Sequence, residues 1–215
     1  MAWIDLSHTI ISGMPQWRGD NQPLQLHRRS EHGPDSHMSS SLELGCHVGT
    51  HIDAPLHFLA GQPGLDEVPV DRFFGPALVV DVRTGRGEPA AAGPLGPEIL
   101  ANRDLAGIDF VLLLTGWDRH WGQPLYYREW PWLSADLAKV LAAAGLKGVG
   151  LDTPSLDDFQ GHEAHDICAA AGMINIENLT GLDRLPGSGS LFQALPLKLQ
   201  GTEASPVRAV AWVEP

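Results

Sequence analysis

Two short, mostly apolar runs are Val149-Gly150-Leu151-Asp152 and Met173-Ile174-Asn175-Ile176-Glu177. Runs of this length without strict alternation are typical of strands that are buried on both faces. A helical pattern from 163 to 171 lies between them. This stretch therefore predicts two parallel strands joined by a crossover helix.

The same pattern extends toward the N-terminus. Residues 77–82 and 110–115 predict two further buried strands. Ser134 is an N-cap residue for a helix that we expect to end at Gly145, and Pro97 opens a short helix. Strands that alternate with helices indicate an α/β fold with a central, mostly parallel sheet.

The two ends of the chain show different patterns. Residues 3–10 alternate well enough to predict an edge strand, whereas residues 13–37 are rich in Gly, Pro, Ser and His and predict a long loop. A loop of that length is usually functional, and we expect it to cover the site as a lid. Residues 195–199 and 207–213 predict two antiparallel strands, and residues 83–97 a surface connection.

A dense group of metal-compatible side chains occupies residues 47–57, which read His47-Val-Gly-Thr-His51-Ile-Asp53-Ala-Pro-Leu-His57. Neutral imidazole and carboxylate groups suit zinc, manganese or iron. A catalytic ion typically takes three protein ligands and leaves one position open for water. The density of ligand types in one segment predicts a metal site rather than a solvated loop.

Period-2 alternation over residues 38–53 predicts a strand whose polar face carries His47, His51 and Asp53. In a fully extended chain, the two histidines would lie roughly 13 Å apart, too far to share one ion. The chain must therefore bend between them, and Gly49 is the residue that permits the bend.

At this point the sequence resembles the cyclase family of metal-dependent hydrolases, which includes bacterial kynurenine formamidase and isatin hydrolase. The resemblance covers nearly the whole chain, and it implies one domain (1–215) with a three-layer β/β/α, swivelling-domain-like fold that adds a second, antiparallel sheet. Besides residues 47–57, it is carried by Asp5-Leu6-Ser7, residues 14–20, 68–71 with 75–77, Asp152-Thr153-Pro154-Ser155, His165 and residues 176–179.

The resemblance implies a set of metal ligands. In the formamidase branch, the positions of His47, His51 and Asp53 bind a first ion. Asp53 and Glu177 bridge to a second ion, which His165 completes. This layout implies two Zn²⁺ or Mn²⁺ ions per chain, but isatin hydrolases have a similar layout and use a single manganese, so the resemblance leaves the number of ions open.

Other positions acquire roles by the same resemblance. His57 corresponds to the proton donor and acceptor, and Trp17 to a residue that lines the substrate pocket. His162 is an alternative to His165 as the histidine that binds the second ion. His165 is preferred because its twelve-residue spacing to Glu177 matches the family pattern. Arg18 stands where the formamidase pattern has proline, and it either binds a substrate carboxylate or points to solvent.

The implied activity is a metal-dependent hydrolysis of a small aryl amide, with N-formylkynurenine giving kynurenine and formate as the first expectation. An isatin hydrolase-like cyclic amidase is the alternative within the class. A non-catalytic protein that binds a metal or small molecule is a second hypothesis, and a dehydratase or ring-closing enzyme is a third. His57 favours catalysis, because a binding site needs no further protonatable group beside its ligands.

The composition of the chain indicates how large a core it can form and which classes of partner it can bind. A chain of 215 residues with 43% apolar content can form one sizeable core, and a net charge of −12 argues against nucleic acid. It has no 18-residue apolar run and no signal-like start, so we expect a cytoplasmic protein without membrane contact. The family resemblance favours a homodimer.

Two other features of the sequence leave alternatives open. Cys46 and Cys168 are too few for a disulfide framework, and Cys46 is expected to be a buried thiol. Residues 117–132 are rich in Trp and Tyr. They suit core packing, a dimer contact or an aromatic wall for a planar substrate.

Overall fold

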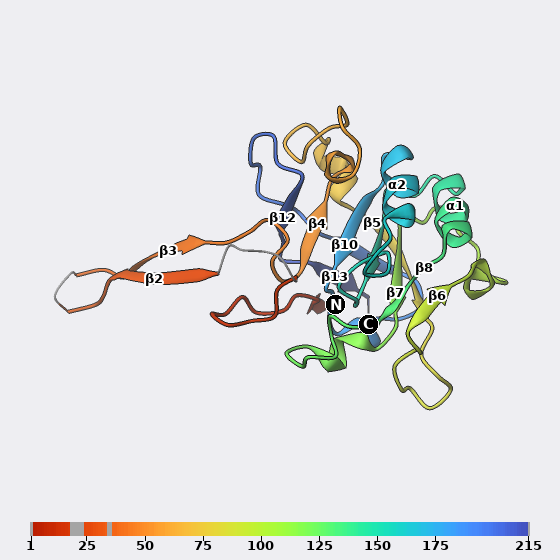
Figure 1. Ribbon diagram of the computed structural model, residues 1–215, viewed down its shortest axis with the longest axis horizontal. Coiled ribbons are helices and arrows are strands. Elements are labelled where there is room, and N and C mark those ends of the chain that lie inside the picture. The colour runs from red at the N-terminus through yellow and green to blue at the C-terminus, as the bar shows by residue number, and fades with distance from the viewer. Residues whose placement is uncertain (1, 18–23, 34–35, 215) are drawn as a thin grey trace.

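The computed structural model describes residues 2–17, 24–33 and 36–214. Within them, nine strands form one mixed, curled sheet (Figure 1). Their spatial order is β1 (Ala2–Asp5), β13 (Val210–Val213), β11 (Ser190–Gln193), β5 (Phe74–Asp81), β7 (Phe110–Leu114), β9 (Gly148–Leu151), β10 (Ile174–Glu177), β4 (His51–Asp53) and β12 (Ala204–Pro206).

The centre of this sheet is parallel, as predicted. Strand β5 pairs with β7, β7 with β9, and β9 with β10, all in parallel register. Helices α1 (Ala135–Ala143) and α2 (Glu163–Ala170) connect β8 to β9 and β9 to β10. Both helices contribute buried residues to the same core cluster, so they cover one face of the parallel strands.

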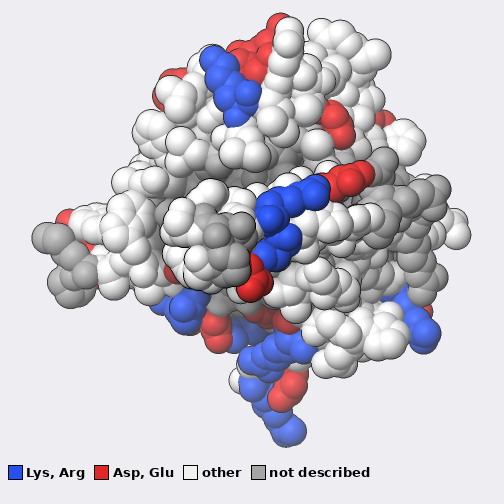
Figure 2. Space-filling view, turned by 90° about the vertical axis from the view of Figure 1, so that its left-hand side faces the viewer, with Lys and Arg blue, Asp and Glu red and all other residues white. Residues whose placement is uncertain are grey.

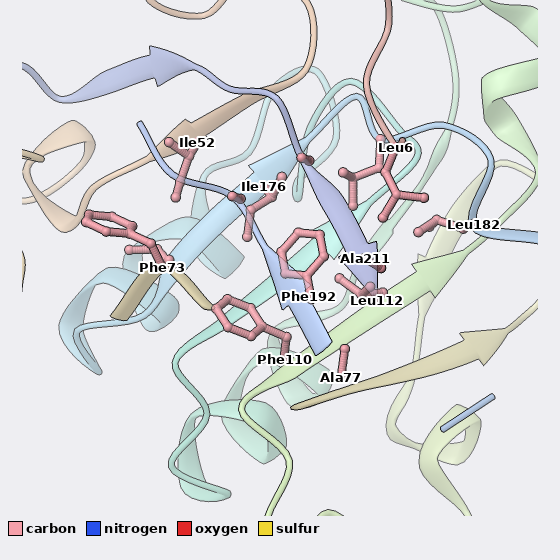
Figure 3. Close-up of a cluster of buried hydrophobic side chains, with 14 of the residues drawn as sticks. Leu6, Ile52, Phe73, Ala77, Phe110, Leu112, Ile176, Leu182, Phe192 and Ala211 are labelled. Atoms are coloured by element: carbon pink, nitrogen blue, oxygen red, sulfur yellow. The ribbon is translucent and has the colours of Figure 1, made fainter. Parts of the chain in front are cut away.

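Residues of β5 and β7 alternate between two hydrophobic clusters. Leu78, Val80, Val111 and Leu113 point toward the helices. The alternate residues of β5 and β7 point to the opposite face of the curled sheet, where they pack against residues from β11 and β13. Figure 3 shows this second cluster, which includes Leu6, Ile52, Phe73, Ala77, Phe110, Leu112, Ile176, Leu182, Phe192 and Ala211.

Two smaller sheets lie outside the main one. Strands β2 (Gln25–Ser30) and β3 (Ser39–Glu43) form an antiparallel hairpin that projects from the body (Figure 1). Strands β6 (Gly93–Leu95) and β8 (Pro131–Leu133) form a short parallel pair. The face toward which the hairpin projects carries basic and acidic side chains among uncharged ones, with no continuous basic surface in its described part (Figure 2).

Short 3₁₀ turns connect the remaining elements. They are η1 (Pro55–His57), η2 (Val70–Phe73), η3 (Pro97–Leu100), η4 (Trp117–His120) and η5 (Leu182–Arg184). The short helix that Pro97 opens is thus a 3₁₀ turn. None of the helices in the described part of the chain is long and apolar enough to cross a membrane.

Several predicted elements need correction. The loop predicted over residues 13–37 contains β2, whose side chains are mostly exposed and polar and gave no strand signal. Residues 195–199 do not form a strand; Pro196 makes only an isolated bridge to Val207. The predicted C-terminal hairpin is therefore wrong, because β13 pairs with β11 and β1 in antiparallel register rather than with residues 195–199. The α/β class is confirmed, as is the small second antiparallel sheet, while the three-layer arrangement stays a prediction.

The N-cap of α1 supports a stability prediction. The Ser134 hydroxyl accepts a hydrogen bond from the Leu137 amide at 3.2 Å. We expect Ser134→Ala to lower the free energy of unfolding by about 1 kcal/mol, because the amide loses its partner. Urea unfolding measures the change. The exposed Ser188 is the control, and an equal loss in Ser188→Ala would contradict the cap.

Candidate active site

The segment before the candidate metal ligands is not one continuous strand. Strand β3 ends at Glu43 and β4 begins at His51, so the strand predicted over residues 38–53 is broken by a turn that carries His47. The predicted bend at Gly49 is present, since its φ is +66°. This left-handed conformation favours glycine, and a Cβ atom there would lie 3.1 Å from Met14 Cε.

The pairing of two strands brings distant parts of the sequence together. Strand β10 pairs with β4 in antiparallel register, with Glu177 opposite His51 and Asn175 opposite Asp53. All four side chains are buried. This register explains how Glu177 joins a motif that lies more than a hundred residues earlier in the chain.

Carboxylate and imidazole groups converge where these strands meet. His47 Nδ1 lies 3.1 Å from Asp53 Oδ1. His51 Nε2 lies 3.6 Å from Asp53 Oδ1 and 3.4 Å from Glu177 Oε2. From the first turn of α2, His165 Nε2 lies 3.1 Å from Glu177 Oε1. The structure thus brings the five candidate ligands to one place.

Two further histidines lie near this cluster. His57, on η1, packs against His47 with ring centroids 4.2 Å apart. His162 is largely exposed and pairs with Asp166 at 2.8 Å. Of His162 and His165, only His165 contacts Glu177 in the described part of the structure.

The cluster has the donor atoms that a divalent metal needs. His47, Asp53 and His57 form one group whose ligand atoms lie within 4.8 Å of one another, and His51, Asp53 and Glu177 form another. Buried polar atoms are normally hydrogen-bonded. In the described structure, however, His51 Nε2 and both Asp53 carboxylate oxygens have no well-formed hydrogen bond. His51 Nε2 and Asp53 Oδ1 lie 3.6 Å apart, and a metal ion bound by these groups would satisfy them.

The electrostatic field at the cluster favours a cation. Burial alone lowers the pKa of His47, but the carboxylates of Asp53, Glu177 and Glu203 outweigh it and raise this pKa to about 9. Burial likewise opposes protonation of His165, yet its bonds to Asp157 and Glu177 raise its pKa to about 10. A field that stabilises protonated imidazoles also attracts a divalent ion.

His57 behaves differently from the other histidines. Burial lowers its pKa from the ordinary value, and the pull of Asp53 in the opposite direction does not compensate. The neutral imidazole that results can accept a proton near neutral pH. His57 is thus suited to proton transfer beside the cluster.

Sequence reasoning assigned no role to three polar residues around the cluster. Asp157 lies 2.7 Å from His165 Nδ1, and Glu203 lies 3.3 Å from His47 Nε2. Asn178, which follows β10 and belongs to the quoted stretch 176–179, donates to the Gly49 carbonyl at 3.0 Å. Asp157 follows the quoted 152–155 motif by two residues, but no local signal in the sequence links Glu203 to His47.

The motif residue Asp152 is structural. Its buried carboxylate accepts hydrogen bonds from the Thr115 amide, the Thr115 hydroxyl and the Gly116 amide. Burial raises the pKa of Asp152 to about 7 despite these bonds. Tyr126 links this network to Asn178 through a 2.8 Å hydrogen bond, so the network holds the loops that follow β7, β9 and β10.

A cavity of about 320 Å³ opens above the cluster. Trp17, Tyr127 and Phe159 line its aromatic side, and Trp17 stacks on Phe159 with ring centroids 5.3 Å apart and planes 18° apart. Trp117, Tyr126 and Trp130 are buried beneath them. Residues 117–132 therefore supply both core packing and part of an aromatic wall.

Two other predicted residues have different outcomes. Arg18 lies outside the described residues. Cys46 and Cys168 are both free thiols, but only Cys168 is buried, and Cys46 is partly exposed. The expectation of a buried Cys46 was wrong, because it lies on the irregular turn rather than on a strand.

Comparisons with known proteins identify the family. The model of the Cyclase family, described as "Putative cyclase", matches residues 4–158. The chain belongs to the Cyclase family. Kynurenine formamidase of Salinibacter ruber is 36% identical over 218 residues, which cover 98% of this chain and 97% of that protein. Kynurenine formamidase of Paracidovorax citrulli is 34% identical, and the match covers 98% of this chain and 95% of that protein.

Solved structures agree with this assignment. Isatin hydrolase A from Labrenzia aggregata, bound to benzyl benzoate, matches with a TM-score of 0.89 and 26% identity, covering 100% of this chain and 94% of that chain. A structure described as a potential metal-dependent hydrolase with cyclase activity matches with a TM-score of 0.80 and 29% identity. The match covers 100% of this chain and 98% of that chain. The comparisons confirm the predicted family and the predicted enzyme class, a metal-dependent amide hydrolase.

Proposed function

We propose that this protein hydrolyses N-formylkynurenine to kynurenine and formate. The observation that carries the proposal is a pair of candidate ligand groups that share Asp53, one of which includes His57, under an aromatic wall. The similarity to two kynurenine formamidases supports this substrate over other aryl amides. The cavity is large enough for one aromatic ring and its substituent.

The proposed ligands are those that meet at Asp53 and Glu177. His47, His51 and Asp53 would hold a first ion, and Asp53, Glu177 and His165 a second. Zinc and manganese both suit this donor set, and we propose two ions per chain. A divalent ion supplies Lewis acidity to an amide carbonyl and lowers the pKa of water toward about 7.

The protein's own groups position the substrate and move the proton. The aryl ring is expected to pack against Trp17 and Tyr127, with the formyl carbonyl facing the carboxylate cluster. His57 takes a proton from the attacking water as the C–O bond forms. It then delivers this proton to the aryl nitrogen as the C–N bond breaks, which releases the arylamine and formate.

A cyclic amidase of the isatin hydrolase type is the second candidate. It is favoured by the TM-score of 0.89 to isatin hydrolase A. The same groups would open a ring amide, so that both products stay in one molecule. We also propose a homodimer, as the family resemblance implies.

A parallel assay tests the proposed function. Metal-stripped protein is reconstituted with Zn²⁺ or Mn²⁺ and incubated with N-formylkynurenine or isatin. We expect faster hydrolysis of N-formylkynurenine, measured as release of kynurenine and formate. Faster opening of isatin would select the second candidate, and full metal loading with neither reaction would reject both.

The aromatic wall gives a prediction about substrate affinity. Trp17 stacks on Phe159 at the cavity, so Trp17→Ala removes a face for the substrate ring. We expect KM to rise about tenfold, with a smaller change in kcat, because a stacked aromatic pair contributes about 0.5–1.5 kcal/mol beyond its buried area. Steady-state kinetics measures both constants. Trp17→Phe should retain most of the affinity, and an unchanged KM in Trp17→Ala would exclude the contact.

A further inference from the structure

The three candidate histidine ligands share an arrangement. One ring nitrogen of each points toward the carboxylates of Asp53 and Glu177. The opposite nitrogen of each lies within hydrogen-bond distance of an oxygen outside that carboxylate pair. The nitrogens that face the carboxylates are His47 Nδ1, His51 Nε2 and His165 Nε2.

Asp157 is the outer partner of His165. Its carboxylate lies 2.7 Å from His165 Nδ1 and is itself held by the amides of Ala164 and His165 at 2.8 and 3.0 Å. Its backbone carbonyl accepts a 2.8 Å hydrogen bond from the Trp130 indole. Since Asp157 is only 5% exposed, its carboxylate cannot easily turn away from the ring.

Glu203 is the outer partner of His47. It precedes β12, and its backbone carbonyl accepts a 2.8 Å hydrogen bond from the Ala54 amide, one residue after Asp53. Its carboxylate lies 3.3 Å from His47 Nε2, but its side chain is 39% exposed. This contact is therefore held less tightly than the contact between Asp157 and His165.

His51 is held by the backbone instead. Its Nδ1 lies 2.9 Å from the Gly49 carbonyl, which also accepts from Asn178. A carbonyl oxygen can only accept, so Nδ1 carries a proton, and in the neutral ring the lone pair of Nε2 faces the cluster. His47 and His165 each have a carboxylate oxygen in the corresponding place, beside the ring nitrogen that faces away from Asp53 and Glu177.

We propose that Asp157 and Glu203 are positioning residues that fix the tautomers of His165 and His47, so that a metal ion is bound through His165 Nε2 and His47 Nδ1. This inference rests on the metal site of the proposed function. A neutral imidazole has one N–H group, and an outer carboxylate that accepts it leaves the lone pair of the other nitrogen facing the ion. The carboxylate also raises the basicity of the ligand.

Metal affinity tests the role of Asp157. We expect Asp157→Asn to weaken Zn²⁺ binding roughly 10–100-fold, as removal of an outer carboxylate usually does, with the loss confined to one of the two sites. Chelator competition measures both dissociation constants. The matched control is Asp158→Asn, which removes the same charge from the next residue, whose carboxylate accepts from Gln160 and Gly161 and contacts neither ligand histidine. Equal affinities in the Asp157 variant and the wild type would overturn the proposal.

Glu203→Gln should have a smaller effect in the same direction. Because Glu203 is partly exposed, we expect the affinity to fall by about tenfold, at the lower end of the usual range. Glu88→Gln, at an exposed residue away from the cluster, controls for the change in net charge. An equal loss of affinity in both variants would reject a specific role for Glu203.

Spectroscopy separates positioning from general destabilisation. The visible absorption spectrum of the Co²⁺-loaded protein reports ligand geometry, and we expect Asp157→Asn to change it while Asp158→Asn leaves it unchanged. In the wild-type protein, ¹⁵N chemical shifts of the zinc-bound imidazoles assign the binding nitrogens even if the Asp157 variant does not fold. Binding through His165 Nδ1 or His47 Nε2 would refute the inference. Neither readout depends on hydrolysis, so a stable metal site without amidase activity would reject only the proposed function.

Discussion

Replacing His51 with alanine is expected to remove tight metal binding and hydrolysis together. His51 is 2% exposed, and its Nε2 lies within 3.6 Å of both Asp53 and Glu177. The change would leave two buried carboxylates without the imidazole between them. We expect the affinity for Zn²⁺ to fall by more than about 100-fold, beyond the usual effect of an outer partner. Metal analysis of the purified variant and chelator competition measure the loss.

His162→Ala is the matched control for His51→Ala. His162 is a histidine at the start of α2, but it is exposed and pairs with Asp166 rather than with the cluster. Its variant should therefore keep the metal content of the wild type. Full metal occupancy in His51→Ala would remove His51 from the set of ligands.

Local patterns predicted the parallel centre of the fold well. The apolar runs at β5, β7, β9 and β10 are strands because their side chains are buried on both faces, which leaves a continuous apolar signal. Ser134 was identified as a cap because its hydroxyl acts within one turn of its own helix. Signals that depend on near neighbours in the chain were sufficient there.

Elements that depend on distant partners were mispredicted. Residues 195–199 alternate like a strand, but they form no strand ladder in the described structure. Strand β2 has the opposite property, since its exposed polar side chains lack a strand signal while its backbone pairs with β3. Register between strands is a tertiary property, and alternation alone cannot supply it.

In the candidate site, too, local features were predictable from the sequence and contacts between distant residues were not. Ligand types crowded into residues 47–57 were visible in the sequence, and so was the need for a bend at Gly49. The pairing of Glu177 with His51 follows from the register of β10 on β4. The contacts of Asp157 and Glu203 with the imidazoles depend on how α2 and the segment before β12 pack, so only the folded chain reveals them.

Replacing His57 with alanine is expected to separate catalysis from metal binding. The neutral His57 imidazole packs at 4.2 Å from the His47 ring, at the edge of the cluster and on the wall of the cavity. We expect kcat to fall roughly 10²–10⁴-fold, the usual contribution of a general acid–base group, while the metal content stays that of the wild type. Steady-state kinetics and metal analysis of the same preparation measure the two quantities.

The alternative role of His57 is that of a ligand, because its ring also belongs to a group with His47 and Asp53. Metal loss in His57→Ala would assign it that role and would leave the proton transfer to another group. His57→Gln serves as the control for volume, since glutamine fills similar space and can hydrogen-bond but cannot transfer a proton near neutral pH. Activity retained in the Gln variant would exclude acid–base catalysis by His57, whereas loss in both variants with metal retained would support it.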